Sequence, residues 1–135
     1  MRFPTNPTQL NMNVLIVDDS RVIRRMIARI MKSIGYETHE AEHGLEGLER
    51  LQELGRVDLI LVDWNMPEMN GLEFVKAVRA DEQHGATPMI MVTTESEMER
   101  MALAFMAGVN EYIMKPFTEE NINSKLEILG IGTTV

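Results

Sequence analysis

The stretch "VDLILVDWNMPEMNG", residues 57–71, begins as an apolar strand and ends as a turn. Its aliphatic run, 59–62, is followed at once by Asp63, and Pro67 stiffens the chain shortly afterwards. A short apolar run bounded by turn residues is typical of a strand buried inside a sheet. Asp63 is therefore expected at the edge of the core, a position that a purely solvent-exposed acid does not need.

Four other short runs resemble this one in length, and helical patterns separate them. The runs at 14–17 and 88–92 are almost wholly apolar, whereas those at 36–41 and 111–114 are polar or mixed. After each run, apolar residues recur at the helical period, which predicts helices at 22–34, 45–54, 72–78, 97–107 and 118–129. Five strands that each precede a helix predict an α/β fold with a parallel sheet covered on both faces.

The composition of the strands indicates their order in the sheet. The apolar runs belong in the middle, and the polar run at 36–41 suits an edge. Right-handed crossovers then favour the order 2-1-3-4-5, the flavodoxin-like, doubly wound (βα)5 arrangement. We expect this domain to span 13–129, with an N-terminal extension at 1–12 and a C-terminal tail at 130–135.

Composition narrows the function further. The length of 135 residues fits one domain, and the net charge of −8 argues against nucleic-acid binding, because a polyanion gains nothing from counterion release. The absence of cysteine excludes disulfides and thiolate metal sites and suits a reducing cytoplasm. We expect a cytoplasmic protein without a membrane partner, because no apolar run approaches the roughly 18 residues of a span and the N-terminus lacks a secretory pattern.

Three acids are expected to meet at one point of this fold. In open parallel sheets ligands bind beyond the carboxyl ends of the strands, where the winding reverses, here between the first and third strands. Asp18 and Asp19 end the first strand, and Asp63 ends the third. Clustered carboxylates repel one another unless a cation intervenes, and hard oxygen ligands suit Mg²⁺. The alternative is that Asp18 and Asp19 cap a helix and Asp63 only starts a turn.

Two more polar residues follow strands of the same sheet. The fourth strand finishes at Thr93, and Lys115 follows the fifth. Alone, such a threonine is commonly a capping or strand-favouring residue, and such a lysine is usually solvated. Beside the three acids, a hydroxyl and an ammonium would complete a phosphate site made of metal, acceptor carboxylate, hydroxyl and cation.

Four motifs in this order resemble the receiver domain of two-component response regulators, specifically the CheY-like single-domain chemotaxis type. They are "VDDS" (17–20), "DWNMPEMNG" (63–71), "VTTE" (92–95) and "YIMKPF" (112–117). The resemblance runs from about residue 13 to 129. It implies a protein that takes a phosphoryl group from a phosphohistidine onto Asp63 and slowly hydrolyses its own aspartyl phosphate, and that is not a metabolic enzyme.

The resemblance also implies a ligand set for Mg²⁺. Asp19, Asp63 and the backbone carbonyl of Asn65 would bind the ion, and Asp18 would act through water or as an outer acid.

Further roles follow from the same resemblance. Thr93 and Lys115 would hold the phosphoryl oxygens, and the peptide bond after Lys115 would be cis. Tyr112 would turn inward as Thr93 is drawn to the phosphate. Asn65 and Glu95 would tune attack by hydrolytic water.

The resemblance implies partners as well. These are a histidine kinase or phosphotransfer domain, a target protein such as the flagellar motor switch, and a phosphatase, with the protein itself a monomer. Two alternatives keep the same site: an intermediate phosphocarrier in a relay, and a receiver that regulates a non-motility target. A small flavin protein of the same topology is a third, but "DDSR" (18–21) puts two acids where flavin phosphate would bind.

Two sequence features depart from the family pattern. Thr94 stands where many relatives have alanine and would crowd the inward position of Tyr112, and Glu68 would alter access to the site.

Several surface properties are expected from residue spacing alone. One side of the first helix carries four cations, which form either a solvated face or a docking side for an acidic partner: Arg21, Arg25, Arg29 and Lys32. Most of the large apolar residues of the fourth helix are expected in the core: Met98, Met101, Phe105 and Met106. The three histidines lack ligand spacing and are expected at the surface: His39, His43 and His84.

Overall fold

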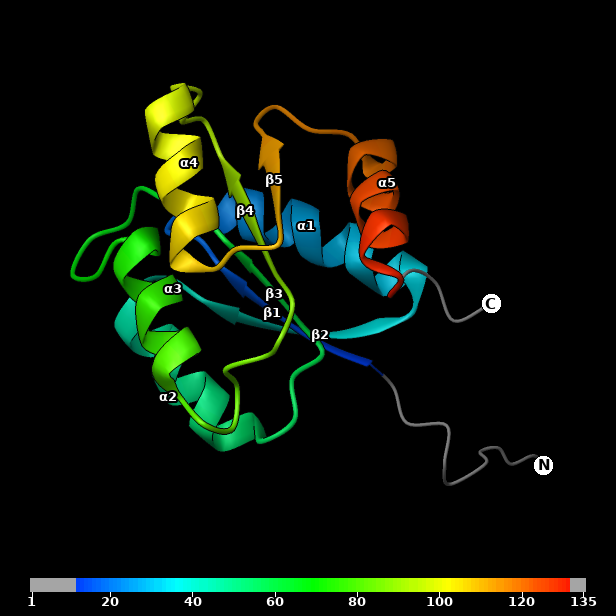
Figure 1. Cartoon of the computed structure of the whole chain (residues 1–135). Helices are drawn as coiled ribbons and strands as arrows, with labels where there is room; N and C mark the ends of the chain where they lie inside the picture. Colours follow the sequence, from blue (N-terminus) through cyan, green and yellow to red (C-terminus); the bar gives the residue numbers. More distant parts are fainter. Residues whose placement is uncertain (1–11, 132–135) are drawn as a thin grey trace.

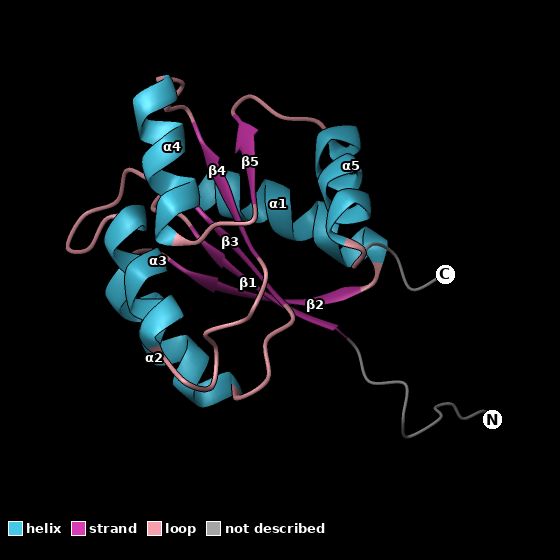
Figure 2. Ribbon diagram, in the orientation of Figure 1, coloured by secondary structure: helices cyan, strands magenta, loops and turns pink. Residues whose placement is uncertain are grey.

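The computed structural model describes residues 12–131. Five parallel strands form one sheet in the order β2-β1-β3-β4-β5, and helices cover both of its faces (Figures 1 and 2). The strands are β1 (Met12–Val17), β2 (Tyr36–Ala41), β3 (Leu59–Val62), β4 (Met89–Thr93) and β5 (Glu111–Met114). The helices are α1 (Arg21–Ile34), α2 (Gly44–Leu54), α3 (Gly71–Ala80), α4 (Met98–Ala107) and α5 (Glu119–Leu129). The predicted flavodoxin-like class and strand order are confirmed.

Alternating side chains of the strands fill two separate cores. In β1, Val14 and Ile16 face one side of the sheet and Leu15 and Val17 the other, as the two-residue period of a strand requires. The first side packs against α1 and α5, and the second against α2, α3 and α4. Both faces of the central strands are therefore buried, which explains why their sequences are continuous apolar runs.

Differences from the predicted boundaries are small and local. β1 begins at Met12, and β3 begins at Leu59 rather than at 57. The carboxylate of Asp58 accepts hydrogen bonds from the backbone N–H of Asn13 (2.7 Å) and from Arg56 Nε (3.1 Å), so this residue tethers the strand instead of extending it. The expected N-terminal extension, apart from Met12, and residues 132–135 of the expected tail lie outside the described residues.

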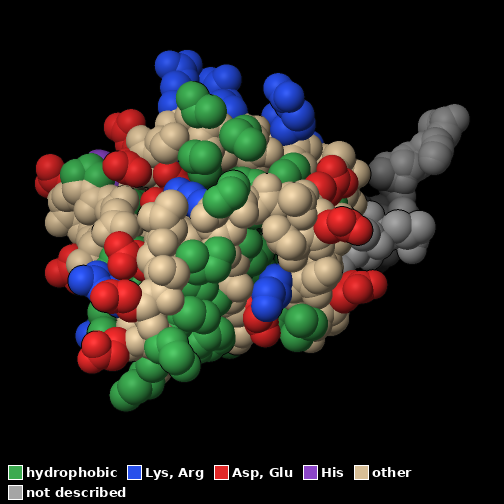
Figure 3. Space-filling model, turned by 90° about the horizontal axis from the view of Figure 1, so that it is seen from above, with side chains coloured by type: hydrophobic (Ala, Val, Ile, Leu, Met, Phe, Trp, Pro, Cys, Tyr) green, Lys and Arg blue, Asp and Glu red, His purple; other side chains and the backbone are tan. Residues whose placement is uncertain are grey.

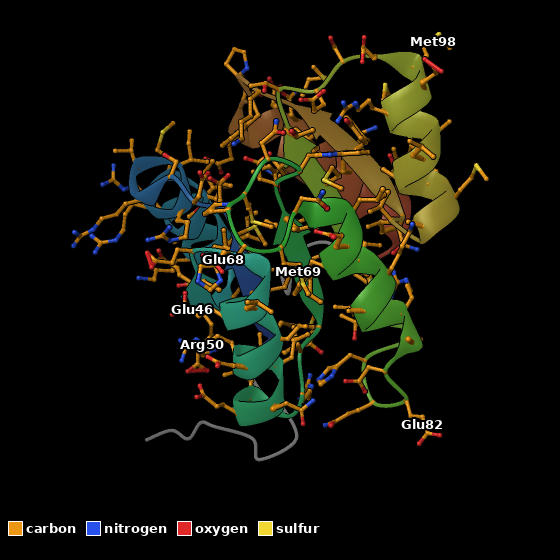
Figure 4. The ribbon with its side chains drawn as sticks, turned by 90° about the vertical axis from the view of Figure 1, so that its left-hand side faces the viewer. Glu46, Arg50, Glu68, Met69, Glu82 and Met98 are labelled. Carbon is orange, nitrogen blue, oxygen red and sulfur yellow. The ribbon has the colours of Figure 1, made fainter. Side chains whose placement is uncertain are left out.

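The expected burial of the large α4 side chains is wrong. Met98 and Met106 are 84% and 82% exposed, Phe105 is 43% exposed, and only Met101 packs partly against the core. The small Ala104 is the buried residue of this helix. Met98 extends away from the body at the outer end of α4 (Figure 4). This helix lies near the β5 edge of the sheet, so it has more apolar side chains than the sheet can cover.

The expected surface position of His84 is also wrong. This side chain is buried, with 1% of its surface exposed. Its Nε2 lies 2.7 Å from the carbonyl oxygen of Gly55, which can only accept, so this nitrogen carries the proton. The contact satisfies a carbonyl left free where α2 ends. His39 and His43 are half-buried; His43 caps α2 by accepting from the backbone N–H of Glu46.

Strand register brings the predicted site residues together. Val17 pairs with Val62, so Asp18 and Asp63 leave the sheet side by side, and the Asp63 N–H donates to the Val17 carbonyl at 2.9 Å. The Lys115 N–H likewise donates to the Thr93 carbonyl at 2.9 Å.

None of the helices within residues 12–131 is both long and apolar enough to cross a bilayer.

Gly71 provides a test of how closely α3 must approach β3. A β-carbon at this first residue of α3 would collide with the backbone carbonyl of Asp63. We expect Gly71→Ala to lower the free energy of unfolding by about 1–3 kcal/mol, the usual cost of forcing extra volume against packed atoms. Urea denaturation followed by circular dichroism measures this loss.

Gly44→Ala is the matched control, because Gly44 is the first residue of α2. There the added carbon would meet the side chain of Met69, including its Cβ at 2.9 Å, so Met69 and its loop must shift, but no backbone atom blocks the new carbon. We expect a smaller loss of stability than for Gly71→Ala. Equal stability of the two variants would contradict the proposed close approach at Gly71.

Candidate functional site

The three predicted acids gather at the carboxyl edge of the sheet. Asp18 and Asp63 are buried, at 1% and 6% exposure, and Asp19 is exposed. One carboxylate oxygen of each lies within 4.8 Å of those of the other two. The N-cap of α1 is Ser20, whose side chain accepts from the Ile23 N–H, so the alternative in which the two neighbouring acids cap this helix does not hold.

Lys115 reaches this cluster from the end of β5. Its Nζ donates to Asp18 Oδ2 at 2.8 Å and to Asp63 Oδ2 at 3.1 Å. The peptide bond between Lys115 and Pro116 is cis. The ammonium thus bridges the two buried carboxylates.

Burial and pairing shift the pKa of two of these groups. Burial raises the pKa of the Asp18 carboxyl, although hydrogen bonds from Lys115 and the Ser20 N–H oppose the shift. Burial alone would lower the pKa of the Lys115 ammonium, but its bond to Asp18 and the charges of Asp63 and Asp18 outweigh this and raise it. The lysine therefore stays charged at neutral pH.

The donor set fits a divalent cation. Three carboxylates opposite one ammonium leave two negative charges when all are ionised. Asp18 Oδ1 accepts from the Ser20 N–H at 2.8 Å and Asp63 Oδ1 from the Trp64 N–H at 2.7 Å, which fixes both carboxylates in orientation. Among the described residues, the Asp19 carboxylate has no hydrogen-bonding or ion-pairing partner. Oxygen ligands with solvent on one side suit Mg²⁺ in particular.

Thr93 and Tyr112 lie on the adjacent strands. Thr93 is fully buried, and its Oγ1 accepts from the Glu95 N–H at 3.3 Å. Tyr112 is 6% exposed and its hydroxyl donates to the backbone carbonyl of Glu95 at 2.8 Å. Burial raises the pKa of this hydroxyl, with the charge of Glu95 as the next cause. Thr94 is exposed.

Asn65 and Glu95 are in direct contact, since Asn65 Nδ2 donates to Glu95 Oε2 at 2.9 Å. Glu68, by contrast, is exposed and adopts a left-handed backbone with φ of 67°. In Figure 4 it lies in the loop beside the start of α2.

Sequence reasoning missed one residue at this site, Arg100. Its guanidinium lies 5.3 Å from the centroid of the Trp64 ring, and its Nε lies 3.8 Å from Glu95 Oε1. A pocket with a volume of about 550 Å³ has Arg100, Trp64, Asn65 and Asp19 in its lining. The spacing to Glu97 indicates a helical ion pair, but no sequence signal places Arg100 over Trp64.

Comparison with known proteins agrees with this geometry. The family described as "Response regulator receiver domain" matches residues 14–127. The chemotaxis protein CheY1 of Helicobacter pylori is 47% identical over 123 residues, covering 90% of this chain and 98% of that protein. The CheY homologue of Campylobacter jejuni is 47% identical, covering 90% and 95%.

A solved structure shares the fold. That of the chemotaxis protein CheY4 of Vibrio cholerae superposes with a TM-score of 0.83 at 39% identity, covering 88% of this chain and 98% of that one. With the match over residues 14–127, these relatives show that the chain belongs to the response regulator receiver family and is of the CheY-like, chemotaxis type.

Proposed function

We propose that this protein is a phosphorylation switch in bacterial chemotaxis, in which a histidine kinase phosphorylates Asp63 and the modified form changes its affinity for a protein target. One observation carries the proposal. The Asp63 carboxylate stands at the end of β3, 3.1 Å from the Lys115 ammonium and within 4.8 Å of two further acids, an arrangement that suits phosphoryl transfer to a carboxylate.

Asp63 is the acceptor in this proposal. A carboxylate oxygen bonds to the phosphorus of a phosphohistidine, the phosphorus–nitrogen bond breaks, and its electron pair stays on the imidazole, which then takes a proton. The loop from Trp64 to Asn70 lies against the pocket, and the Trp64 N–H keeps the carboxylate in one orientation at 2.7 Å. Such alignment matters because this reaction depends on positioning and charge more than on covalent help from side chains.

Asp19, Asp63 and the Asn65 carbonyl would hold Mg²⁺, with Asp18 close by as an outer acid. When bound, the ion would neutralise charge on the phosphoryl oxygens. Lys115 adds a second source of positive charge, because its ammonium lies 3.1 Å from Asp63. Thr93, buried at the end of β4, supplies a hydroxyl to the same oxygens.

A chain of contacts connects the phosphate position with the surface. The Thr93 hydroxyl accepts from the Glu95 N–H, and the Glu95 carbonyl accepts from the Tyr112 hydroxyl. Movement of Thr93 toward a new phosphoryl group would change both contacts. The modification would thereby bias the position of Tyr112, which packs beside Phe105 of α4 with ring centroids 6.3 Å apart.

The exposed side chains of α4 suit a target surface. Met98, Phe105 and Met106 are exposed apolar side chains of α4, and Phe105 lies beside Tyr112. Methionine adapts well to a docked helix. Hydrophobic side chains gather on the face seen in Figure 3. The relatives are chemotaxis proteins, and the target that we propose is the flagellar motor switch.

Other partners would use other surfaces. The exposed cations of α1 would dock an acidic kinase or phosphotransfer domain: Arg21, Arg25, Arg29 and Lys32. Asn65 and Glu95, joined across the site, would tune hydrolysis by water or by a phosphatase. We expect a cytoplasmic monomer.

Binding of Mg²⁺ is expected to quench the fluorescence of Trp64, the single tryptophan of the chain, because the ring adjoins the acids. Asp19→Asn should raise the Mg²⁺ concentration at the midpoint of the titration about tenfold. The substitution removes a charged ligand but breaks no hydrogen bond within the protein. Glu99→Gln, which removes an exposed acid of α4, is the control and should titrate as the parent does. An Asp19→Asn midpoint equal to the parent's would remove Asp19 from the ligand set.

Asp63→Asn should abolish labelling by a small phosphodonor such as acetyl phosphate, because an amide cannot form the mixed anhydride. Mass spectrometry at neutral pH measures the added phosphate. Asp58→Asn, which changes the tethering acid before β3, should still be labelled. Undiminished labelling of the Asp63 variant would refute the acceptor assignment.

Lys115→Ala should still accept phosphate, at a rate lowered by at least tenfold, and should then fail to gain affinity for a flagellar-switch peptide. The reason is that the ammonium would both neutralise the phosphoryl group and hold it in the switched arrangement. Binding is measured with and without acetyl phosphate. A phosphorylated alanine variant that binds the peptide as tightly as the parent would exclude Lys115 from signalling. If the phosphorylated parent binds phosphotransfer domains and not the peptide, the relay alternative is favoured.

A further inference from the structure

Glu95 has both carboxylate oxygens engaged. Its Oε2 accepts from Asn65 Nδ2 at 2.9 Å, and its Oε1 lies 3.8 Å from the Nε of Arg100. The side chain is only 24% exposed. A carboxylate beside a phosphorylated aspartate is a potential base for an attacking water, so the groups that hold it determine whether it can act.

Arg100 reaches this position from the first turn of α4. Its guanidinium lies 5.3 Å from the Trp64 ring centroid and 3.7 Å, through Nε, from Glu97 Oε1. The planar guanidinium can stack on an aromatic ring and pair with a carboxylate at the same time, which an ammonium cannot do equally well. Arg100 therefore joins α4 to the loops that follow β3 and β4.

We infer that Arg100 is a positioning residue that holds Glu95 against Asn65 and thereby slows the loss of phosphate from Asp63. This inference rests on the proposed function. In the hydrolysis concerned, the oxygen of water bonds to phosphorus, the bond from phosphorus to the Asp63 carboxylate oxygen breaks with its electron pair, and the protons of the water leave with inorganic phosphate.

Loss of Arg100 would have two consequences, one for the Glu95 carboxylate and one for the loops around it. Without Arg100, Oε1 loses its cationic neighbour, and the carboxylate gains freedom to turn from Asn65 toward water. Glu95 would then take a proton from the attacking water, pass it on to the departing inorganic phosphate, and so accelerate hydrolysis. The loops after β3 and β4 would also lose their connection to α4, which opens the pocket that Arg100 lines.

The test measures loss of phosphate from the labelled protein after removal of the donor. Arg100→Ala should lose phosphate about fivefold faster than the parent, the effect expected when an exposed ion pair and a cation–π contact are both removed. Arg100→Lys should lie between the two, because it retains the charge but not the planar stack. Glu99→Gln should decay at the parent rate, because Glu99 is an exposed acid of the same helix that, among the described residues, pairs with neither Arg100 nor Glu95.

Two measurements separate positioning from a general structural effect. The emission of Trp64 should change in Arg100→Ala and partly return in Arg100→Lys. In a Glu95→Gln background, Arg100→Ala should have no further effect on the rate of phosphate loss. The double variant should therefore lose phosphate at the rate of Glu95→Gln alone. A fivefold effect that persists in the double variant would overturn the inference, as would an Arg100→Ala decay equal to the parent's. If the parent incorporates no phosphate, the proposed function fails as well; if the parent decays normally and only the Arg100 effect is missing, this inference alone fails.

Discussion

The ion pairs between the Lys115 ammonium and the carboxylates of Asp18 and Asp63 are the interaction on which the site depends. Two buried acids repel each other, and removing each from water costs several kcal/mol unless a cation compensates. The lysine provides this cation and fixes both acids in one geometry. The two negative charges that remain keep the site ready for a divalent ion and, on the proposed function, for a phosphoryl group.

The scaffold holds these charges by means of backbone register rather than side-chain packing. Parallel pairing of β1 with β3 and of β4 with β5 places the four strand ends at one edge, so each functional residue begins its loop from a rigid position. Gly71 allows the start of α3 to return against the Asp63 carbonyl, and its N–H donates to the Trp64 carbonyl at 2.8 Å. The loop that carries Trp64 and Asn65 is thereby closed at both ends.

Glu95 connects the interior of the site to its exterior. Its backbone contacts Thr93 and Tyr112, and its side chain contacts Asn65 and Arg100. A change at the phosphate position would therefore reach both the buried tyrosine and the exposed helix α4 through one residue. On the proposed function, α4 could therefore respond to chemistry at the carboxyl ends of the strands, which its first turn adjoins through Arg100.

The sequence by itself determined the elements, the strand order and the convergence of Asp18, Asp19 and Asp63, because strand periodicity and crossover handedness depend on local pattern and chirality. It also pointed to Thr93 and Lys115 through their places after strands. Only the tertiary structure decided which apolar side chains are covered. Met98 and Met106 are exposed because α4 lies near the sheet edge, and His84 is buried because the α2 terminus left a carbonyl to satisfy. The position of Arg100 over Trp64 was likewise decided by packing. It depends on how α4 is oriented across the sheet, and no spacing along the chain encodes that orientation.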